Sequence, residues 1–175
     1  MSAPAPANAL ALSRPLLRGL GLLNLLYAAA IGLLFVAGLV APDVVFDALG
    51  VRHGEQRAAL VLGMRTVMVA GLVAAFVVDR VLRHLLAMVD TVRAGDPFVA
   101  GNARRLQAIA WWVLAGEVLR LAIGATAWAA SSPAQGLDLD TGFSLAPWLA
   151  VLLLFVLARV FAEGTRLRDD LAGTV

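Results

Sequence analysis

Two charged residues stand inside an apolar stretch that is long enough to cross a membrane. The stretch runs from Leu106 to Ala130 and carries Glu117 and Arg120 near its middle. A charged side chain in hydrocarbon is costly unless it is paired. Such residues therefore face the inside of a helical bundle and mark either a structural ion pair or a functional site.

A third charge, Arg65, lies inside another apolar stretch. If the two helices enter the membrane at Arg57 and Leu106 from opposite faces, Arg65 lies about 12 Å from one face and Glu117 about 16 Å from the other. These depths nearly coincide in a hydrocarbon core of about 30 Å. We predict that Glu117 pairs with Arg65, while Arg120 shares the carboxylate or reaches the outer interface. Either a static lock or a proton-coupled or ligand-sensing group fits this pattern.

A second polar layer is expected near the inner face of the membrane. Asn24 and Arg159 each lie within about 10 Å of that face along their helices. Glu163 follows Arg159 by one helical turn. Extension of Arg159 to the lipid headgroups is the simpler interpretation of that arginine.

Patterns typical of enzymes are absent from the sequence. It contains no HExxH, phosphate loop or GxSxG motif, and no cysteine. The two histidines, His53 and His84, lie outside the predicted hydrocarbon core, so paired haem ligands are not expected. We therefore expect no catalytic residue, no metal site and no cofactor.

Composition places the chain among membrane proteins. Of its 175 residues 61% are hydrophobic and the mean hydropathy is +0.87, well above the values of soluble domains. We expect an all-α polytopic membrane protein, with four transmembrane helices in one bundle and the lipid bilayer as its main partner. No loop combines clustered arginines with exposed aromatic residues, so direct binding of nucleic acid is not expected.

Four apolar segments have spanning length, at about 19–41, 58–78, 106–128 and 143–161. A cleaved signal peptide is the competing interpretation of the first segment, but its apolar region is typically only about 7 to 15 residues long. Residues 1–13 are uncharged and rich in alanine and proline, which predicts a disordered tail. Residues 14–175 then form a single domain.

Helical spacing continues beyond the second and fourth segments. Apolar positions recur at intervals of three and four residues from Val78 to Val92, which predicts an extension of about 22 Å into water. Asp90 and Arg93 fall at a pairing distance on this extension. Gly95, Asp96 and Pro97 interrupt the pattern, and Asn102 is the expected cap of the next helix. The fourth helix should likewise continue into the C-terminal tail.

The distribution of arginine predicts the orientation. Only Arg52 and Arg57 flank the spans on one side. Nine arginines flank them on the other, which places both termini in the cytoplasm by the positive-inside rule: Arg14, Arg18, Arg80, Arg83, Arg93, Arg104, Arg105, Arg166 and Arg168.

Two segments, GDPFVAGNARRLQAIAWW and FAEGTRLRDDLAGTV, resemble the YoaS-like bacterial family called domain of unknown function 2975. The similarity extends over most of the chain from the second span onward. This resemblance implies a four-span protein of the bacterial inner membrane. It also implies a genomic neighbour that is a small helix-turn-helix regulator, and hence a cytoplasmic transcriptional regulator as a partner.

Two functions follow as expectations. The first is a membrane-bound regulatory or sensory protein that holds a soluble regulator on its cytoplasmic face. The second is a small transporter or channel subunit with a polar path around Glu117. Association between copies of the chain is left open. The candidate docking residues on the cytoplasmic face are Asp96, Pro97, Phe98, Asn102, Arg105, Leu167 and Asp170.

Overall fold

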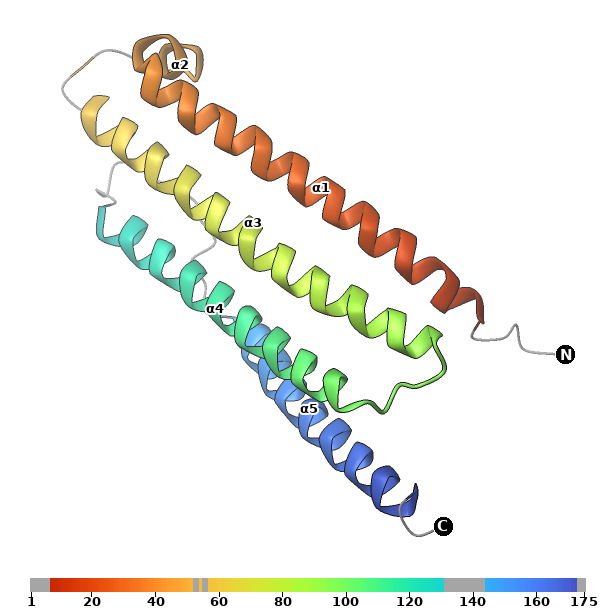
Figure 1. Cartoon of the computed structure of the whole chain (residues 1–175). Helices are drawn as coiled ribbons and strands as arrows, with labels where there is room; N and C mark the ends of the chain where they lie inside the picture. Colours follow the sequence, from red (N-terminus) through yellow and green to blue (C-terminus); the bar gives the residue numbers. More distant parts are fainter. Residues whose placement is uncertain (1–6, 52–53, 55–56, 131–143, 173–175) are drawn as a thin grey trace, which may run out of the picture.

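The protein is all-helical in the part of the chain that its structure, a computed structural model, describes: residues 7–51, 54, 57–130 and 144–172. Four long helices and one short helix follow one another along the chain (Figure 1). Their bounds are α1 Ala7–Val40, α2 Pro42–Ala48, α3 Arg57–Arg93, α4 Ala100–Ala130 and α5 Leu145–Ala172.

The four long helices are each apolar and long enough to cross a membrane. In the most hydropathic part of each, between 6% and 17% of the residues are buried inside the molecule. A water-soluble bundle would hide its apolar side chains, whereas here lipid can solvate them. The predicted fold class, a polytopic all-α membrane protein with four spanning helices, is confirmed.

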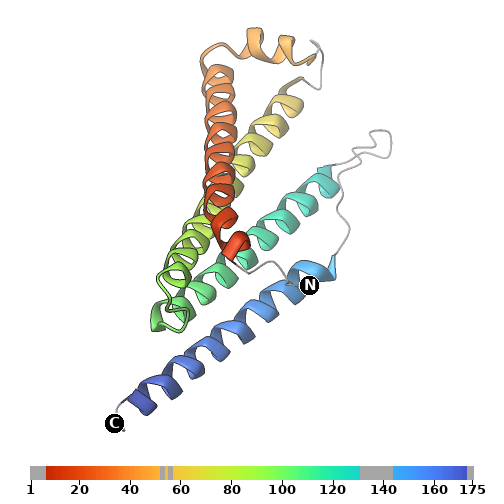
Figure 2. The ribbon, with the colours of Figure 1, turned by 90° about the vertical axis from the view of Figure 1, so that its right-hand side faces the viewer.

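The helices pack in chain order: α1 lies on α3, α3 on α4, and α4 on α5. Two perpendicular views show this open succession of helices (Figures 1 and 2). The short helix α2 lies across the far end of α1 (Figure 2). The start of α1 and the end of α5 both lie at the end of the molecule where α3 turns into α4 (Figure 1).

Small residues let α1 and α3 approach closely. A methyl group added to Gly71 would lie 3.0 Å from the hydroxyl of Tyr27, and Ala75 is only 4% exposed. The amide of Asn24 donates a hydrogen bond of 2.9 Å to the carbonyl oxygen of Ala75. A methyl group added to Gly63, two turns earlier on α3, would meet no neighbouring atom within 4 Å. The close approach of the two helices therefore involves the middle of α3 rather than its start.

The predicted disordered tail is wrong for residues 7–13, because α1 begins at Ala7. Residues 1–6 lie outside the described residues. The early turns of α1 are tied to α3 by an ion pair of 3.1 Å between Arg14 and Asp90. Asp90 therefore pairs across helices, and not with Arg93 on its own helix as predicted.

The helical continuation predicted beyond the second and fourth spans is confirmed. α3 runs without a break to Arg93, and α5 runs to Ala172. The short helix α2 follows α1 directly, and Gly50 comes after its end with a positive φ of 83°. Residues 131–143, which include the predicted start of the fourth span, lie outside the described residues.

Candidate functional site

The turn between α3 and α4 is built from residues that cannot continue a helix. Gly95 adopts a φ of 87°, a conformation that costs glycine little. The amide of Gly95 donates to the carbonyl of Val92, and the amide of Asp96 to that of Thr91. These two bonds form a Schellman motif, which satisfies carbonyls at the end of α3. Pro97 then prevents the helix from resuming.

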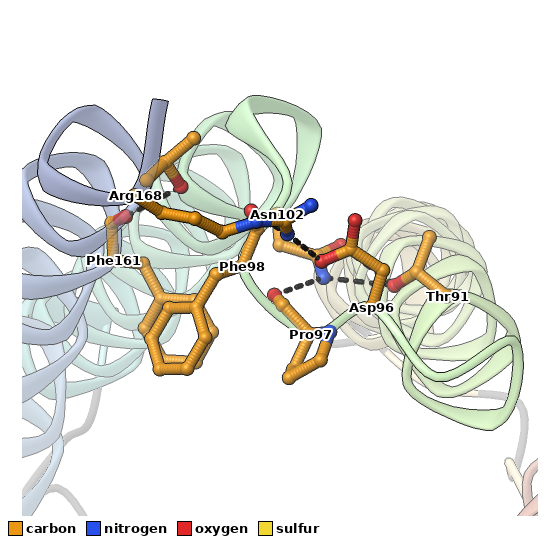
Figure 3. A network of polar contacts seen from close by, with 8 residues as sticks. Thr91, Asp96, Pro97, Phe98, Asn102, Phe161 and Arg168 are labelled. Atoms are coloured by element: carbon orange, nitrogen blue, oxygen red, sulfur yellow. Dashed lines mark hydrogen bonds and ion pairs between the residues drawn. The ribbon is translucent and has the colours of Figure 1, made fainter. Parts of the chain in front are cut away.

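Asn102 is the buried centre of this turn. Its side chain is fully buried, although the sequence predicted a helix cap and a docking residue. α4 begins at Ala100, so Asn102 stands third in the helix and the predicted cap is wrong. Its amide nitrogen donates to the Thr91 hydroxyl at 2.8 Å and to the carbonyl of Pro97 at 2.9 Å (Figure 3). Its amide oxygen accepts from Arg105 at 2.8 Å.

Helix α5 is fastened to the same turn by an arginine and a phenylalanine. Arg168 forms an ion pair with Asp96 and donates to the carbonyl of Phe98 at 3.3 Å. The ring of Phe98 packs on that of Phe161, with centroids 5.4 Å apart (Figure 3). Gly164 makes room for this ring, because a methyl group there would lie 3.2 Å from it.

These contacts join the ends of three helices into one unit, here called the turn platform. It consists of Thr91, Asp96, Pro97, Phe98, Asn102, Arg105, Phe161 and Arg168.

The structure thus brings together five of the predicted docking residues, but one of them cannot touch a partner. Asn102 is inaccessible, whereas Phe98 remains 43% exposed. Leu167 lies on the adjacent tail of α5 and is 55% exposed, and Asp170 is also exposed. Leu171, one turn beyond Leu167, is 72% exposed. The accessible part of the predicted docking surface therefore consists of Phe98 in the turn and the adjacent tail of α5.

The predicted ion pair between Glu117 and Arg65 is wrong. Glu117 is 6% exposed and is held by Arg120 on its own helix. The Arg120 Nε and Nη2 atoms donate to the two carboxylate oxygens at 3.0 and 2.7 Å. This bidentate geometry neutralises the carboxylate from one turn away along α4, so Arg120 holds Glu117 without Arg65.

Arg65 instead satisfies a backbone carbonyl near the C-terminal end of α1. It donates a hydrogen bond of 2.8 Å to the carbonyl of Gly38. The helical partner of that carbonyl would be the amide of residue 42, but Pro42 has no amide hydrogen. The guanidinium also lies 5.6 Å from the ring centroid of Phe46 in α2. Arg65 thus joins α3 to the corner between α1 and α2, where the helix dipole favours a cation.

The predicted inner polar layer is not one cluster. Asn24 is bonded to α3, whereas Arg159 and Glu163 lie on α5, which packs on α4. Glu163 lies 3.8 Å from Arg166 and is not joined to Arg159 by an ion pair or hydrogen bond within the described residues. Asn24 therefore makes no contact with Arg159 or Glu163, because α3 and α4 separate α1 from α5.

A groove of about 590 Å³ lies between the start of α4 and the later half of α5. Four alanines form part of its lining: Ala100, Ala103, Ala158 and Ala162. Three arginines also line it, Arg104, Arg159 and Arg166, together with two aspartates near the end of α5. No local pattern in the sequence indicates that these arginines line one groove, because they come from two helices about 50 residues apart in the chain.

Two residues of the turn platform carried no signal in the sequence. Arg168 and Thr91 look like ordinary surface residues of helical extensions. Their partners, Asp96 and Asn102, lie 72 and 11 residues away. Within the described part of the chain, no group of three histidine or acidic side chains could hold a metal ion.

Comparison with known proteins identifies the family. The profile of the family described as "Protein of unknown function (DUF2975)" matches residues 37–175. The chain therefore belongs to this family, as the resemblance of its two segments indicated. No curated protein and no solved structure matches the chain.

Proposed function

We propose that this member of the DUF2975 family is a membrane-bound regulatory protein that holds a soluble helix-turn-helix regulator against the tail of α5, beside its turn platform. The resemblance noted in the sequence suggests the chemical class of the partner. The exposed leucines of the α5 tail support the proposed place of contact.

The proposed orientation puts the turn platform in the cytoplasm of a bacterial cell, with the protein in the inner membrane. Nine arginines flank the spans at the end where α3 turns into α4, and two flank them at the other end. Excess arginine marks the cytoplasmic side of membrane helices. A soluble transcriptional regulator would meet the protein on this side.

One observation carries the proposal: exposed leucines stand beside a rigid polar unit. Leu167 and Leu171 are 55% and 72% exposed, and lie one turn apart on α5. The ion pair between Arg168 and Asp96 fixes this segment relative to α3 and α4. Apolar side chains held on a rigid support lose little entropy when a partner covers them, and this favours binding.

The transporter function receives less support. It depends on Glu117 as a group that can exchange protons or bind a ligand. Both oxygens of this carboxylate accept hydrogen bonds from Arg120, a geometry that favours a structural lock. The groove between α4 and α5 is lined by other residues.

Photo-crosslinking in native membranes tests the proposal. A photoreactive amino acid replaces Leu167, and the adducts are identified by mass spectrometry. The control carries the same amino acid at Leu16, which is 65% exposed in the early part of α1. We expect an adduct with a helix-turn-helix protein at position 167 and none at position 16. Adducts only with lipid or with the chain itself would contradict the proposal.

A second measurement separates partner binding from folding. Leu167→Ser combined with Leu171→Ser should lower recovery of the crosslinked or co-purified regulator at least about tenfold, the equivalent of about 1.4 kcal/mol. Both side chains are exposed, so the free energy of unfolding should change little. Equal recovery by the wild type and the double variant would show that the leucines do not contact the regulator.

A further inference from the structure

The groove between α4 and α5 has the chemistry of a site for a phosphate group. Its lining carries three guanidinium groups, from Arg104, Arg159 and Arg166, and two carboxylates, from Asp169 and Asp170. Guanidinium groups bind phosphate oxygens through paired hydrogen bonds. The volume of about 590 Å³ suits a small headgroup.

The carboxylates do not neutralise all three arginines. Arg166 lies 3.9 Å from Asp170 and 3.8 Å from Glu163, so acids of its own helix already balance it. Asp169 lies beside Arg168 in the chain. Arg104 and Arg159 form no ion pair or hydrogen bond with any residue of the described chain. Two guanidinium groups thus face the groove from opposite walls without a protein partner.

The depth of these arginines matches the headgroup layer of a bilayer. Arg104 stands two residues before the predicted start of the third span, and Arg159 two residues before the predicted end of the fourth. Each therefore lies about 3 Å from the membrane boundary along its helix. Phe155 and the alanines of the lining offer apolar surface beside these charges. A phospholipid has a matching arrangement, because its charged phosphate group lies next to its apolar acyl chains.

We propose that this groove binds the phosphate of an anionic phospholipid, with Arg104 and Arg159 as the direct ligands. Basic pockets between membrane helices near the cytoplasmic face suit such headgroups. Ala100 and Ala103 belong to the first turn of α4, whose dipole also favours an anion. The small side chains on both helices leave the space that the headgroup occupies.

Native mass spectrometry of the full chain in detergent tests this site. The probes are phosphatidylglycerol, cardiolipin and phosphatidylcholine, added separately. The variant is Arg104→Gln with Arg159→Gln. Arg18→Gln is the control, because Arg18 is an exposed arginine near the same membrane boundary on α1. We expect the double variant to bind the anionic lipids about thirtyfold more weakly, which corresponds to about 2 kcal/mol. The control should bind them as the wild type does.

A soluble probe distinguishes the two sources of phosphate. Inorganic phosphate and glycerol phosphate are added to the wild type, and its thermal unfolding is followed by tryptophan fluorescence. Stabilisation by the anionic lipids but not by these soluble ions supports the lipid. Equal stabilisation by inorganic phosphate would overturn the lipid assignment.

The proposal as a whole fails on either of two results. One is lipid binding by the double variant that equals that of the wild type. The other is an equal loss of anionic-lipid binding in Arg18→Gln, which would show that any exposed arginine near the membrane has the same effect. A loss of folding is not expected to explain the result, because neither Arg104 nor Arg159 has an ion-pair or hydrogen-bond partner among the described residues. The unfolding of the variant without added lipid checks this directly.

Discussion

Replacing Asn102 by alanine should weaken the fold more than any other single change of an amide in this chain. The side chain is fully buried and forms hydrogen bonds with Thr91 at the end of α3, with Pro97 in the turn and with Arg105 on α4. The Thr91 hydroxyl keeps its own bond to the Met88 carbonyl at 2.7 Å, but the carbonyl of Pro97 and the guanidinium of Arg105 each lose a partner.

The expected loss follows from these bonds. Each is worth about 1 kcal/mol net, and a buried acceptor left without a donor costs about 1–3 kcal/mol. Part of the arginine's loss is recovered, because Arg105 is only partly buried and water can reach it. We therefore expect Asn102→Ala to lower the free energy of unfolding by about 2–4 kcal/mol.

Unfolding in mixed detergent micelles, followed by tryptophan fluorescence, measures this change. Gln107→Ala is the matched control, since it removes an exposed amide five residues further along the same helix. The control should change the free energy by no more than about 0.5 kcal/mol. Thr91→Val adds a double-mutant cycle, in which the coupling with Asn102→Ala should be about 1 kcal/mol.

Two outcomes would refute this account of the turn. If Asn102→Ala unfolded like Gln107→Ala, the buried amide would contribute nothing to stability. A coupling energy near zero with Thr91→Val would show that the bond between Asn102 and Thr91 is not formed in the membrane.

Three further predictions concern contacts elsewhere in the bundle. Arg65→Leu leaves the carbonyl of Gly38 without its donor, and should cost about 1–3 kcal/mol in the same unfolding assay. Glu117→Gln removes the charge that balances Arg120 and should cost about 1–3 kcal/mol, less than a fully buried pair because Arg120 is 37% exposed. Gly164→Ala forces a methyl group against an aromatic ring and should cost about 1–3 kcal/mol, whereas Gly21→Ala meets no neighbour and should stabilise α1 slightly.

Each of these has a result that contradicts it. Wild-type stability of Arg65→Leu would mean that lipid or water satisfies the end of α1 equally well. If proton-dependent transport into vesicles required Glu117, this carboxylate would have a role in transport and would not be only a structural ion pair. Equal effects of the two glycine substitutions would show that the ring beside Gly164 moves aside freely.

Hydropathy and helical spacing by themselves determined the architecture. Segments of about 20 apolar residues must form helices in lipid, because only a helix satisfies its own backbone there. The extension of α3 to Arg93, the break at Gly95 and the helical tail of α5 follow from local patterns in the same way. These features depend only on residues close together in the chain, so they can be predicted from the sequence.

Depth along a helix was not enough to assign the partners of charged residues. Arg65 and Glu117 were predicted to pair because they lie at similar depths. Depth does not determine how each helix is rotated about its own axis. Arg65 points toward α1, whereas Glu117 is bound by Arg120 on α4. The same limit applied to Asn24 and Arg159, which share a depth but lie on helices that other helices separate.

The contacts of the turn platform and the groove between α4 and α5 belong to the tertiary structure alone. Asn102 looked like a helix cap because its local sequence suits one, and only the packing of α4 against α3 buries it. Arg168 pairs with Asp96, which is 72 residues away in the chain. Arg104 on α4 and Arg159 on α5 line the same groove. The sequence fixes which residues enter the membrane, since each segment meets the lipid on its own. Which helix faces which is decided by how side chains fit together, and no single segment carries that information.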